Sequence, residues 1–227
     1  METEVLRINF GMVNAYLLRA GDGFVLVDTG MPMHWRALEA ELLRAGALPG
    51  KLSLAVITHG DLDHTGNCGR LQKQYGVRIA IHPGDRDQVQ NGKPLVRESG
   101  TPMGGVMRAL GGIAARFQKR GAFPAPATFA PDILLADKQS LSAFGLDATV
   151  LHAPGHTPGS IVLLTGDGRL LAGDTFANMF GSHAPPFIEN RQQLRESIAM
   201  LKRLDARTVY PGHGQPFPFE EIRNILI

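Results

Sequence analysis

The sequence predicts an α+β protein in which two mixed β-sheets pack face to face and helices cover their outer surfaces. Three observations support this prediction. Short apolar runs typical of strands alternate with longer runs of helical periodicity. The Asp28-Thr29 pair that follows an early strand has a counterpart in Asp174-Thr175, which indicates two similar halves. Histidines and aspartates follow several predicted strands, so they are expected along one edge of the sheets.

The first half of the chain has a clear order of elements. Three strands are expected at residues 5–8, 13–18 and 24–27. Gly21-Asp22-Gly23 supplies turn chemistry between the last two strands. A helix is predicted over 34–45, followed by a buried strand over 52–57 and a helix over 65–75. The buried side of the first helix is predicted to be Trp35, Leu38 and Leu42.

The second half continues with strands and a helix. A strand is expected over 148–151, and the turn Gly166-Asp167-Gly168 joins 161–164 to 169–172. A helix over 191–204 is predicted to bury the apolar stripe Leu194, Ile198, Leu201 and Leu204. Residues 83–131 interrupt the pattern with Gly, Pro and Ala and contain one amphipathic stretch, 106–119. We interpret 83–131 as an insertion that forms either a lid or substrate wall, or a surface excursion.

Composition indicates one soluble domain spanning residues 1–227. The chain has 44% hydrophobic and 19% charged residues with a net charge of +2, ordinary values for a globular protein. Basic residues are not clustered with aromatic ones, which argues against nucleic-acid binding. No apolar stretch approaches the roughly 20 residues that cross a bilayer, and the first residues do not form a secretory signal. A cytoplasmic location is therefore expected, and a homodimer is an open alternative for the oligomeric state.

Four side chains that can bind metals lie within six positions of one loop. His59, Asp61, Asp63 and His64 follow the predicted strand 52–57 directly. Side chains two apart in an extended segment point the same way, so His59 and Asp61 are expected to face one centre. Asp63 and His64, where the chain turns, can face a second. Imidazole nitrogen and carboxylate oxygen suit zinc, iron or manganese better than calcium.

Three further residues extend this set. His156, Asp174 and His213 each follow an apolar strand and lie in or beside a Gly or Pro turn. The alternative is that Asp61 or Asp63 caps the next helix and that the histidines are satisfied loop residues. That alternative explains any one of these residues, but it does not explain the whole set.

These residues resemble the metallo-beta-lactamase-fold hydrolases, whose motif is His-x-His-x-Asp-His followed by a lone His, a bridging Asp and a final His. The resemblance implies a four-layer αββα sandwich. It also implies that His59, Asp61 and His156 hold one metal and that Asp63, His64 and His213 hold the other, with Asp174 between them. The element Val27-Asp28-Thr29-Gly30 matches a family signature that places Asp28 behind the ligands.

One position departs from the family pattern, which here reads His-x-Asp-x-Asp-His because Asp61 replaces the second histidine. A carboxylate adds negative charge and hardens the first site. The resemblance implies two divalent cations, with zinc as the first choice and iron or manganese as alternatives that Asp61 favours.

Two cations can hold a bridging hydroxide as nucleophile, which predicts a hydrolase. Comparison with the branches of the family that the chain resembles narrows the expected substrate to a small-molecule ester, thioester or lactone. Asp63 is the candidate catalytic residue, since it can orient the nucleophile and pass a proton to the leaving group. His183, in a loop after Asp174, is a candidate substrate contact. Two other functions remain open: an iron-dependent redox protein acting on sulfur, and a metal-depleted binding protein.

Overall fold

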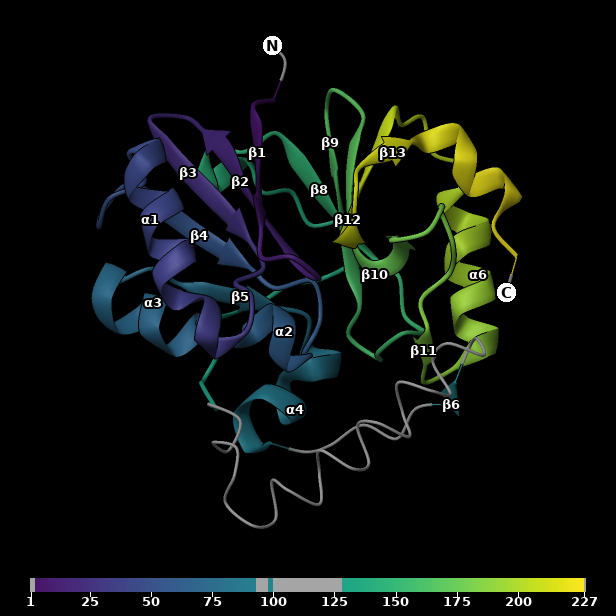
Figure 1. Ribbon diagram of the computed structural model, residues 1–227, viewed down its shortest axis with the longest axis horizontal. Coiled ribbons are helices and arrows are strands. Elements are labelled where there is room, and N and C mark those ends of the chain that lie inside the picture. The colour runs from purple at the N-terminus through teal and green to yellow at the C-terminus, as the bar shows by residue number, and fades with distance from the viewer. Residues whose placement is uncertain (1–2, 93–97, 100–127, 227) are drawn as a thin grey trace.

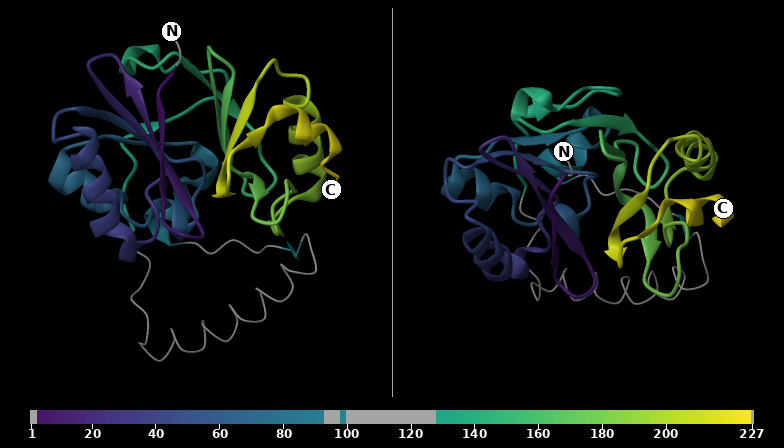
Figure 2. Two further views of the ribbon diagram at one scale, coloured as in Figure 1. Left: turned by 45° about the horizontal axis from the view of Figure 1, so that its top comes forward. Right: turned by 90° about the horizontal axis from the view of Figure 1, so that it is seen from above.

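Two β-sheets form the centre of the protein, and helices cover both outer faces (Figures 1 and 2). The computed structural model describes residues 3–92, 98–99 and 128–226. The predicted α+β class and its αββα layers are confirmed by this arrangement. Within the described part of the chain, no helix combines the length and apolar character that a membrane span requires.

The first sheet contains the early strands that the sequence predicted. In spatial order it comprises β1 (Val5–Asn9), β2 (Asn14–Ala20), β3 (Gly23–Val27), β4 (Leu52–Val56), β5 (Ile79–Ile81) and β7 (Ile133–Leu134). The first three strands are antiparallel, and from β3 onward the pairing is parallel. Parallel strands β3 and β4 therefore end at the same edge, where Asp28 and His59 follow them.

The second sheet is also mixed. In spatial order it comprises β13 (Phe217–Pro218), β12 (Thr208–Gly214), β10 (Arg169–Asn178), β9 (Ile161–Thr165) and β8 (Ala148–His152). Only β10 and β12 pair in parallel, which brings Asp174 and His213 to the same end of the sheet. A small third sheet pairs β11 (Phe187–Ile188) with β6 (Glu98–Ser99).

Three apolar layers hold these elements together. The helices α1 (Trp35–Ala45) and α3 (Cys68–Tyr75) pack on the outer face of the first sheet, as predicted for the buried side of α1. Side chains such as Val25 and Leu163 fill the space between the sheets. The helix α6 (Arg191–Leu201) covers the second sheet through Leu194, Ile198 and Leu201. Short 3₁₀ helices lie at η1 (Pro32–His34), η2 (Pro83–Asp85), η3 (Ser142–Phe144) and η4 (Phe219–Asn224).

Two predicted helices have different bounds in the structure. The expected helix 65–75 is divided into α2 (Leu62–Thr65) and α3, because Asn67 bonds to the Thr29 segment instead of continuing α2. Its backbone N–H donates to Thr29 Oγ1 at 3.1 Å, and its side-chain amide donates to Thr29 O at 2.7 Å. Helix α6 stops at Leu201 and not at Leu204, since the next residues form tighter bonds to carbonyls three positions back.

The predicted insertion 83–131 is described only in part. Residues 83–91 form η2 and the helix α4 (Arg86–Asn91), which lies beside the loop after β4. The predicted amphipathic helix 106–119 and the apolar side chains expected on a lid lie outside the described residues. The lid therefore stays a prediction.

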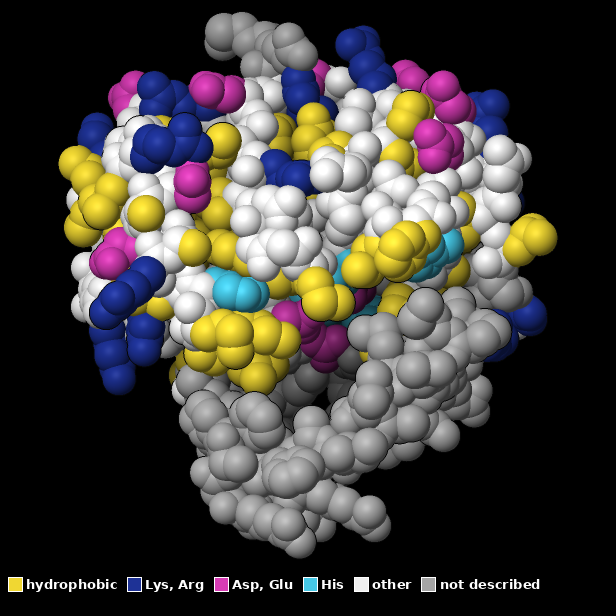
Figure 3. All heavy atoms as spheres, viewed as in Figure 1, with side chains coloured by type: hydrophobic (Ala, Val, Ile, Leu, Met, Phe, Trp, Pro, Cys, Tyr) yellow, Lys and Arg dark blue, Asp and Glu magenta, His cyan; other side chains and the backbone are white. Residues whose placement is uncertain are grey.

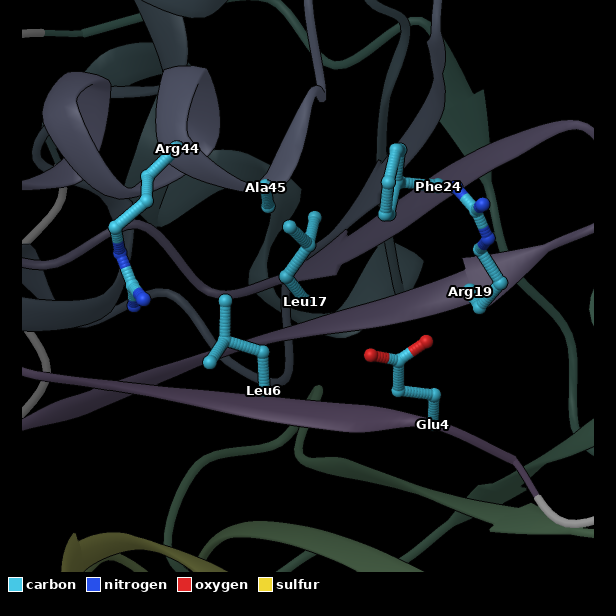
Figure 4. Close-up of a pocket in the computed structure, with 7 residues that line it drawn as sticks. All are labelled: Glu4, Leu6, Leu17, Arg19, Phe24, Arg44 and Ala45. Carbon is cyan, nitrogen blue, oxygen red and sulfur yellow. The ribbon is translucent and has the colours of Figure 1, made fainter.

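A cavity of about 270 Å³ opens between β1, β2, β3 and the end of α1 (Figure 4). Leu6, Leu17 and Ala45 supply its apolar walls. The Arg19 guanidinium lies 4.8 Å from the centre of the Phe24 ring. Arg44 at the other end donates to Glu41 on the same helix. The guanidinium groups of Arg19 and Arg44 thus already have partners within the fold.

Candidate metal centre

The fold brings all seven predicted ligands to one end of the sheets. His59 and Asp61 lie in the loop after β4, whereas Asp63 and His64 lie in the short helix α2. Ligand-competent atoms of these residues approach one another in three groups: His59, Asp61 and His156; His59, His64 and Asp174; Asp63, His64 and His213. Two of them are the sites that the family resemblance implies: His59, Asp61 and His156, called the first group below, and Asp63, His64 and His213, called the second group.

Two of the predicted ligands lie inside strands, whereas the sequence predicts them just after strand ends. Asp174 belongs to β10 and His213 to β12, and the pairing of these strands shifts register on both sides of Gly173. Gly173 has φ of +48°, and a Cβ there would lie 2.5 Å from Thr58 Oγ1. The irregularity around this glycine allows Asp174 to face the cluster while its strand continues.

The first group is centred on Asp61. Its Oδ2 lies 3.2 Å from His156 Nε2 and 3.4 Å from His59 Nε2. In the second group Asp63 Oδ2 lies 3.3 Å from His213 Nε2 and 3.7 Å from His64 Nε2.

Asp174 lies between the two groups. Its Oδ2 is 3.7 Å from His156 Nε2 in the first group and 3.2 Å from His213 Nε2 in the second. This is the placement that a bridging carboxylate requires.

Hydrogen bonds at Nδ1 leave Nε2 of two imidazoles available to bind a cation. His156 Nδ1 donates to Phe187 O at 2.8 Å, and His213 Nδ1 donates to Met12 O at 2.6 Å. In a neutral imidazole, a protonated Nδ1 leaves a lone pair on Nε2. Nε2 faces the cluster in both residues.

The other two histidines are oriented through Asp28 and Thr58. His64 Nδ1 lies 2.8 Å from Asp28 Oδ2. Thr58 Oγ1 donates its proton to Asp28 at 2.8 Å, so it accepts from His59 Nδ1 at 3.0 Å. Bonds of this kind behind the ligands fix ring orientation in metal sites.

Buried atoms without hydrogen-bond partners mark the centre of the cluster. Among the described residues, His59 Nε2, His64 Nε2 and Asp174 Oδ1 are buried and have no hydrogen-bond partner, although His64 Nε2 lies 3.3 Å from Asp174 Oδ1. Such atoms are rare in folded proteins unless a bound group satisfies them. Nitrogen and carboxylate donors in these groups fit two divalent transition-metal cations.

Opposite charges shift the pKa values within the cluster. Burial raises the pKa of the Asp174 carboxyl, but the His213 and His64 imidazoles outweigh burial and hold that pKa well below its usual range. The pKa of the Asp63 carboxyl is lowered in the same way: burial raises it, but the neighbouring imidazoles, chiefly His64, outweigh burial. Burial lowers the pKa of His213, yet Asp174 and Asp63 raise it to about 10. The carboxylates therefore stay ionised, as cation binding requires.

The metallo-beta-lactamase resemblance is confirmed by comparison with known proteins. A family model described as the metallo-beta-lactamase superfamily matches residues 8–213. The chain belongs to this superfamily.

Individual relatives of the chain include named hydrolases. The chain is 29% identical over 214 residues to a hydroxyacylglutathione hydrolase of Anaeromyxobacter dehalogenans (strain 2CP-C), covering 93% of this chain and 66% of that protein, just under two thirds of its length. It is 25% identical over 227 residues to the acyl-coenzyme A thioesterase MBLAC2 of Bos taurus, covering 92% of this chain and 75% of that protein. The solved BLEG-1 B3 metallo-beta-lactamase matches with a TM-score of 0.72 and 21% identity, covering 98% and 97% of the two chains. That last likeness shows the fold alone.

The superfamily signature around Asp28 has a structural basis. Asp28 has φ of 60°, a left-handed conformation that aspartate tolerates better than most residues. Its Oδ1 accepts the Thr58 N–H at 2.8 Å, so one carboxylate connects the ends of β3 and β4 to His64. The structure thus places Asp28 directly behind a predicted ligand.

Backbone pairing places His183 near the ligand cluster. It pairs with Ala177 of β10, and Ala177 in turn pairs with His213 of β12. Its Nδ1 donates to Ala184 O at 2.6 Å. Its role as a substrate contact stays a prediction.

Two residues that sequence reasoning missed contact the ligand loops from η2 and α4. Asp85 is 1% exposed, and it accepts from Gly60 N at 2.8 Å, Gly159 N at 2.7 Å and Thr157 Oγ1 at 2.7 Å. Gln88 donates to Asp61 Oδ1 at 3.0 Å. The only sequence signal is an acidic residue after Pro83-Gly84, within the range 83–131 that the sequence predicts as an insertion.

Proposed function

We propose that this protein is a hydrolase that uses two divalent metal ions to cleave an ester, thioester or lactone bond in a small molecule. The convergence of two ligand groups around Asp174 is the observation that supports it most strongly. The named relatives add support, since one is called a hydrolase of hydroxyacylglutathione and another an acyl-coenzyme A thioesterase.

The chain's own residues divide the work of this reaction. His59, Asp61 and His156 would hold one cation, and Asp63, His64 and His213 the other, with Asp174 shared. When bound, such a pair lowers the pKa of water and polarises the substrate carbonyl. The Asp63 side chain is 25% exposed against 9% for Asp174. Asp63 is thus the carboxylate that faces incoming substrate, where it can orient the attacking water and carry a proton to the leaving group.

Exposed apolar side chains near the cluster favour an acyl substrate. Phe180 is 88% exposed and Met12 is 59% exposed. Met12 adjoins the cluster because its carbonyl oxygen accepts from His213, and the loop with Phe180 follows β10 next to the end of β12. On the face of the molecule drawn in Figure 3, hydrophobic side chains lie beside acidic and histidine side chains near the middle. An apolar acyl group could pack there, whereas a phosphodiester would gain little.

A substrate panel tests the proposal. We expect turnover of thioesters, esters or lactones, with kcat/KM rising up to about fourfold per added acyl methylene, since burying one methylene contributes about 0.8 kcal/mol. The measurement compares an acyl-thioester series with a lactone, a phosphodiester and a beta-lactam at fixed metal concentration. Faster cleavage of the phosphodiester or beta-lactam than of every acyl substrate would refute the assignment.

Asp61 supports a second candidate, an iron-dependent redox protein acting on a sulfur substrate. Its carboxylate lies 3.2 Å from His156 Nε2, so the first group offers a harder donor set than three imidazoles would. Purified protein of this kind would absorb visible light and consume oxygen. A colourless preparation with acyl hydrolase activity would exclude it.

Replacing Asp61 tests whether this residue sets the metal preference. We expect Asp61→His to shift the bound metal toward zinc, because an imidazole replaces a hard oxygen donor. Elemental analysis after exposure to equal zinc, iron and manganese measures the shift. Metal ratios unchanged from those of the wild-type protein would show that Asp61 is not a ligand.

A further inference from the structure

Gln88 holds one oxygen of the Asp61 carboxylate from the side of α4. Gln88 Nε2 donates to Asp61 Oδ1 at 3.0 Å. The other oxygen, Oδ2, faces His156 Nε2 at 3.2 Å and His59 Nε2 at 3.4 Å. The hydrogen bond therefore fixes which oxygen is presented to the first ligand group.

The approach of Gln88 depends on Gly60. A Cβ at position 60 would lie 2.5 Å from Gln88 Oε1 and 2.8 Å from its Cδ. A residue with any side chain there would push the carboxamide away from Asp61. The glycine between two predicted ligands thus leaves room for a third residue that contacts one of them.

The orientation of the Gln88 amide follows from the charge of Asp61. Gln88 Oε1 is buried and has no hydrogen-bond partner among the described residues. Reversing the amide would place this oxygen against a carboxylate, where the two acceptors repel. A buried carbonyl oxygen without a hydrogen bond costs free energy. The hydrogen bond from Gln88 Nε2 to Asp61 must outweigh this cost, so it determines the orientation of the amide.

We propose that Gln88 is a positioning residue that orients Asp61 for the cation held by His59, Asp61 and His156. This inference rests on the proposed metal-dependent function. A carboxylate can rotate and bind a cation through one oxygen or both. By occupying Oδ1, Gln88 restricts Asp61 to one-oxygen binding through Oδ2. Mutating a residue that hydrogen-bonds to a metal ligand typically lowers metal affinity by about 10- to 100-fold.

The test uses Gln88→Met, which keeps the length of the side chain and removes its donor. Gln90→Met is the matched control, because Gln90 lies on the same helix, is exposed, and bonds to Arg86 Nε at 3.0 Å. Zinc affinity is measured by chelator competition in two full-length backgrounds. His213→Ala weakens the second group and reports on the first, and His156→Ala weakens the first group and reports on the second.

Gln88→Met is expected to weaken zinc binding about 10- to 100-fold in the His213→Ala background and to leave it unchanged in the His156→Ala background. In an Asp61→Ala background it should change nothing further. A structural role would instead weaken both groups and lower the stability of the metal-free protein, and that pattern would overturn the inference. Affinity equal to that of Gln90→Met would overturn it too. Wild-type protein that binds neither zinc nor iron nor manganese would refute the proposed function itself, which separates the two failures.

Discussion

Asp63→Asn is expected to lower kcat/KM by about 10²- to 10⁴-fold, the range that a positioned acid or base contributes. The amide keeps the shape of the side chain but removes its negative charge and its capacity to accept a proton. His213 and His64 lie 3.3 Å and 3.7 Å from its carboxylate, so the change acts within the second ligand group. Steady-state kinetics on the best thioester substrate measures the effect.

The fold should survive this substitution, because Asp63 is partly exposed and lies in the short helix α2. Circular dichroism and the melting temperature of metal-free protein check this point. Asp22→Asn, in the exposed turn between β2 and β3, is a control of the same chemistry and should retain full activity. Near-native turnover by Asp63→Asn would refute its catalytic role.

Asp85→Ala is expected to destabilise the protein by about 3 to 5 kcal/mol, because each buried donor left without a partner costs about 1 to 3 kcal/mol. The backbone N–H groups of Gly60 and Gly159 lose their acceptor, as does the Thr157 hydroxyl. These donors belong to the loops that carry His59 and His156. Urea unfolding of metal-free protein measures the loss, and we expect metal affinity to fall with it.

A nearby aspartate separates this effect from the general loss of a carboxylate. Asp87, on the same segment, is exposed and accepts from Asn91 at 2.9 Å. Asp87→Ala should change the free energy of unfolding by less than about 1 kcal/mol. If Asp85→Ala unfolds at the same urea concentration as Asp87→Ala, the Asp85 network does not hold the ligand loops.

The sequence predicted most of the fold because local patterns determine it. Strands β1 to β4 of the first sheet and the buried face of α1 follow from periodicity, which depends on neighbouring residues only. Six-position clustering from His59 to His64 indicated the candidate site in the same way. The distant residues His156, Asp174 and His213 joined the set because each follows an apolar strand beside a Gly or Pro turn, and the family resemblance divided the set into two metal sites.

Bonds between distant segments were beyond sequence reasoning. Asp85 contacts Gly60 and Gly159, which are 25 and 74 positions away, and no periodic pattern encodes such pairs. The division between α2 and α3 has the same origin, since Asn67 bonds to Thr29, 38 positions before it. The sequence predicts a strand over 169–172, whereas β10 continues past Gly173, which has a positive φ, to Asn178.

Metal content tests the central claim most directly. Protein purified without added metal, then titrated with zinc and freed of excess, should retain about two divalent ions per chain by elemental analysis, as a two-metal site requires. The His213→Ala variant should retain about one. Retention of well under one ion per chain by the wild-type protein, with no acyl hydrolase activity, would contradict the account and favour a metal-depleted binding protein.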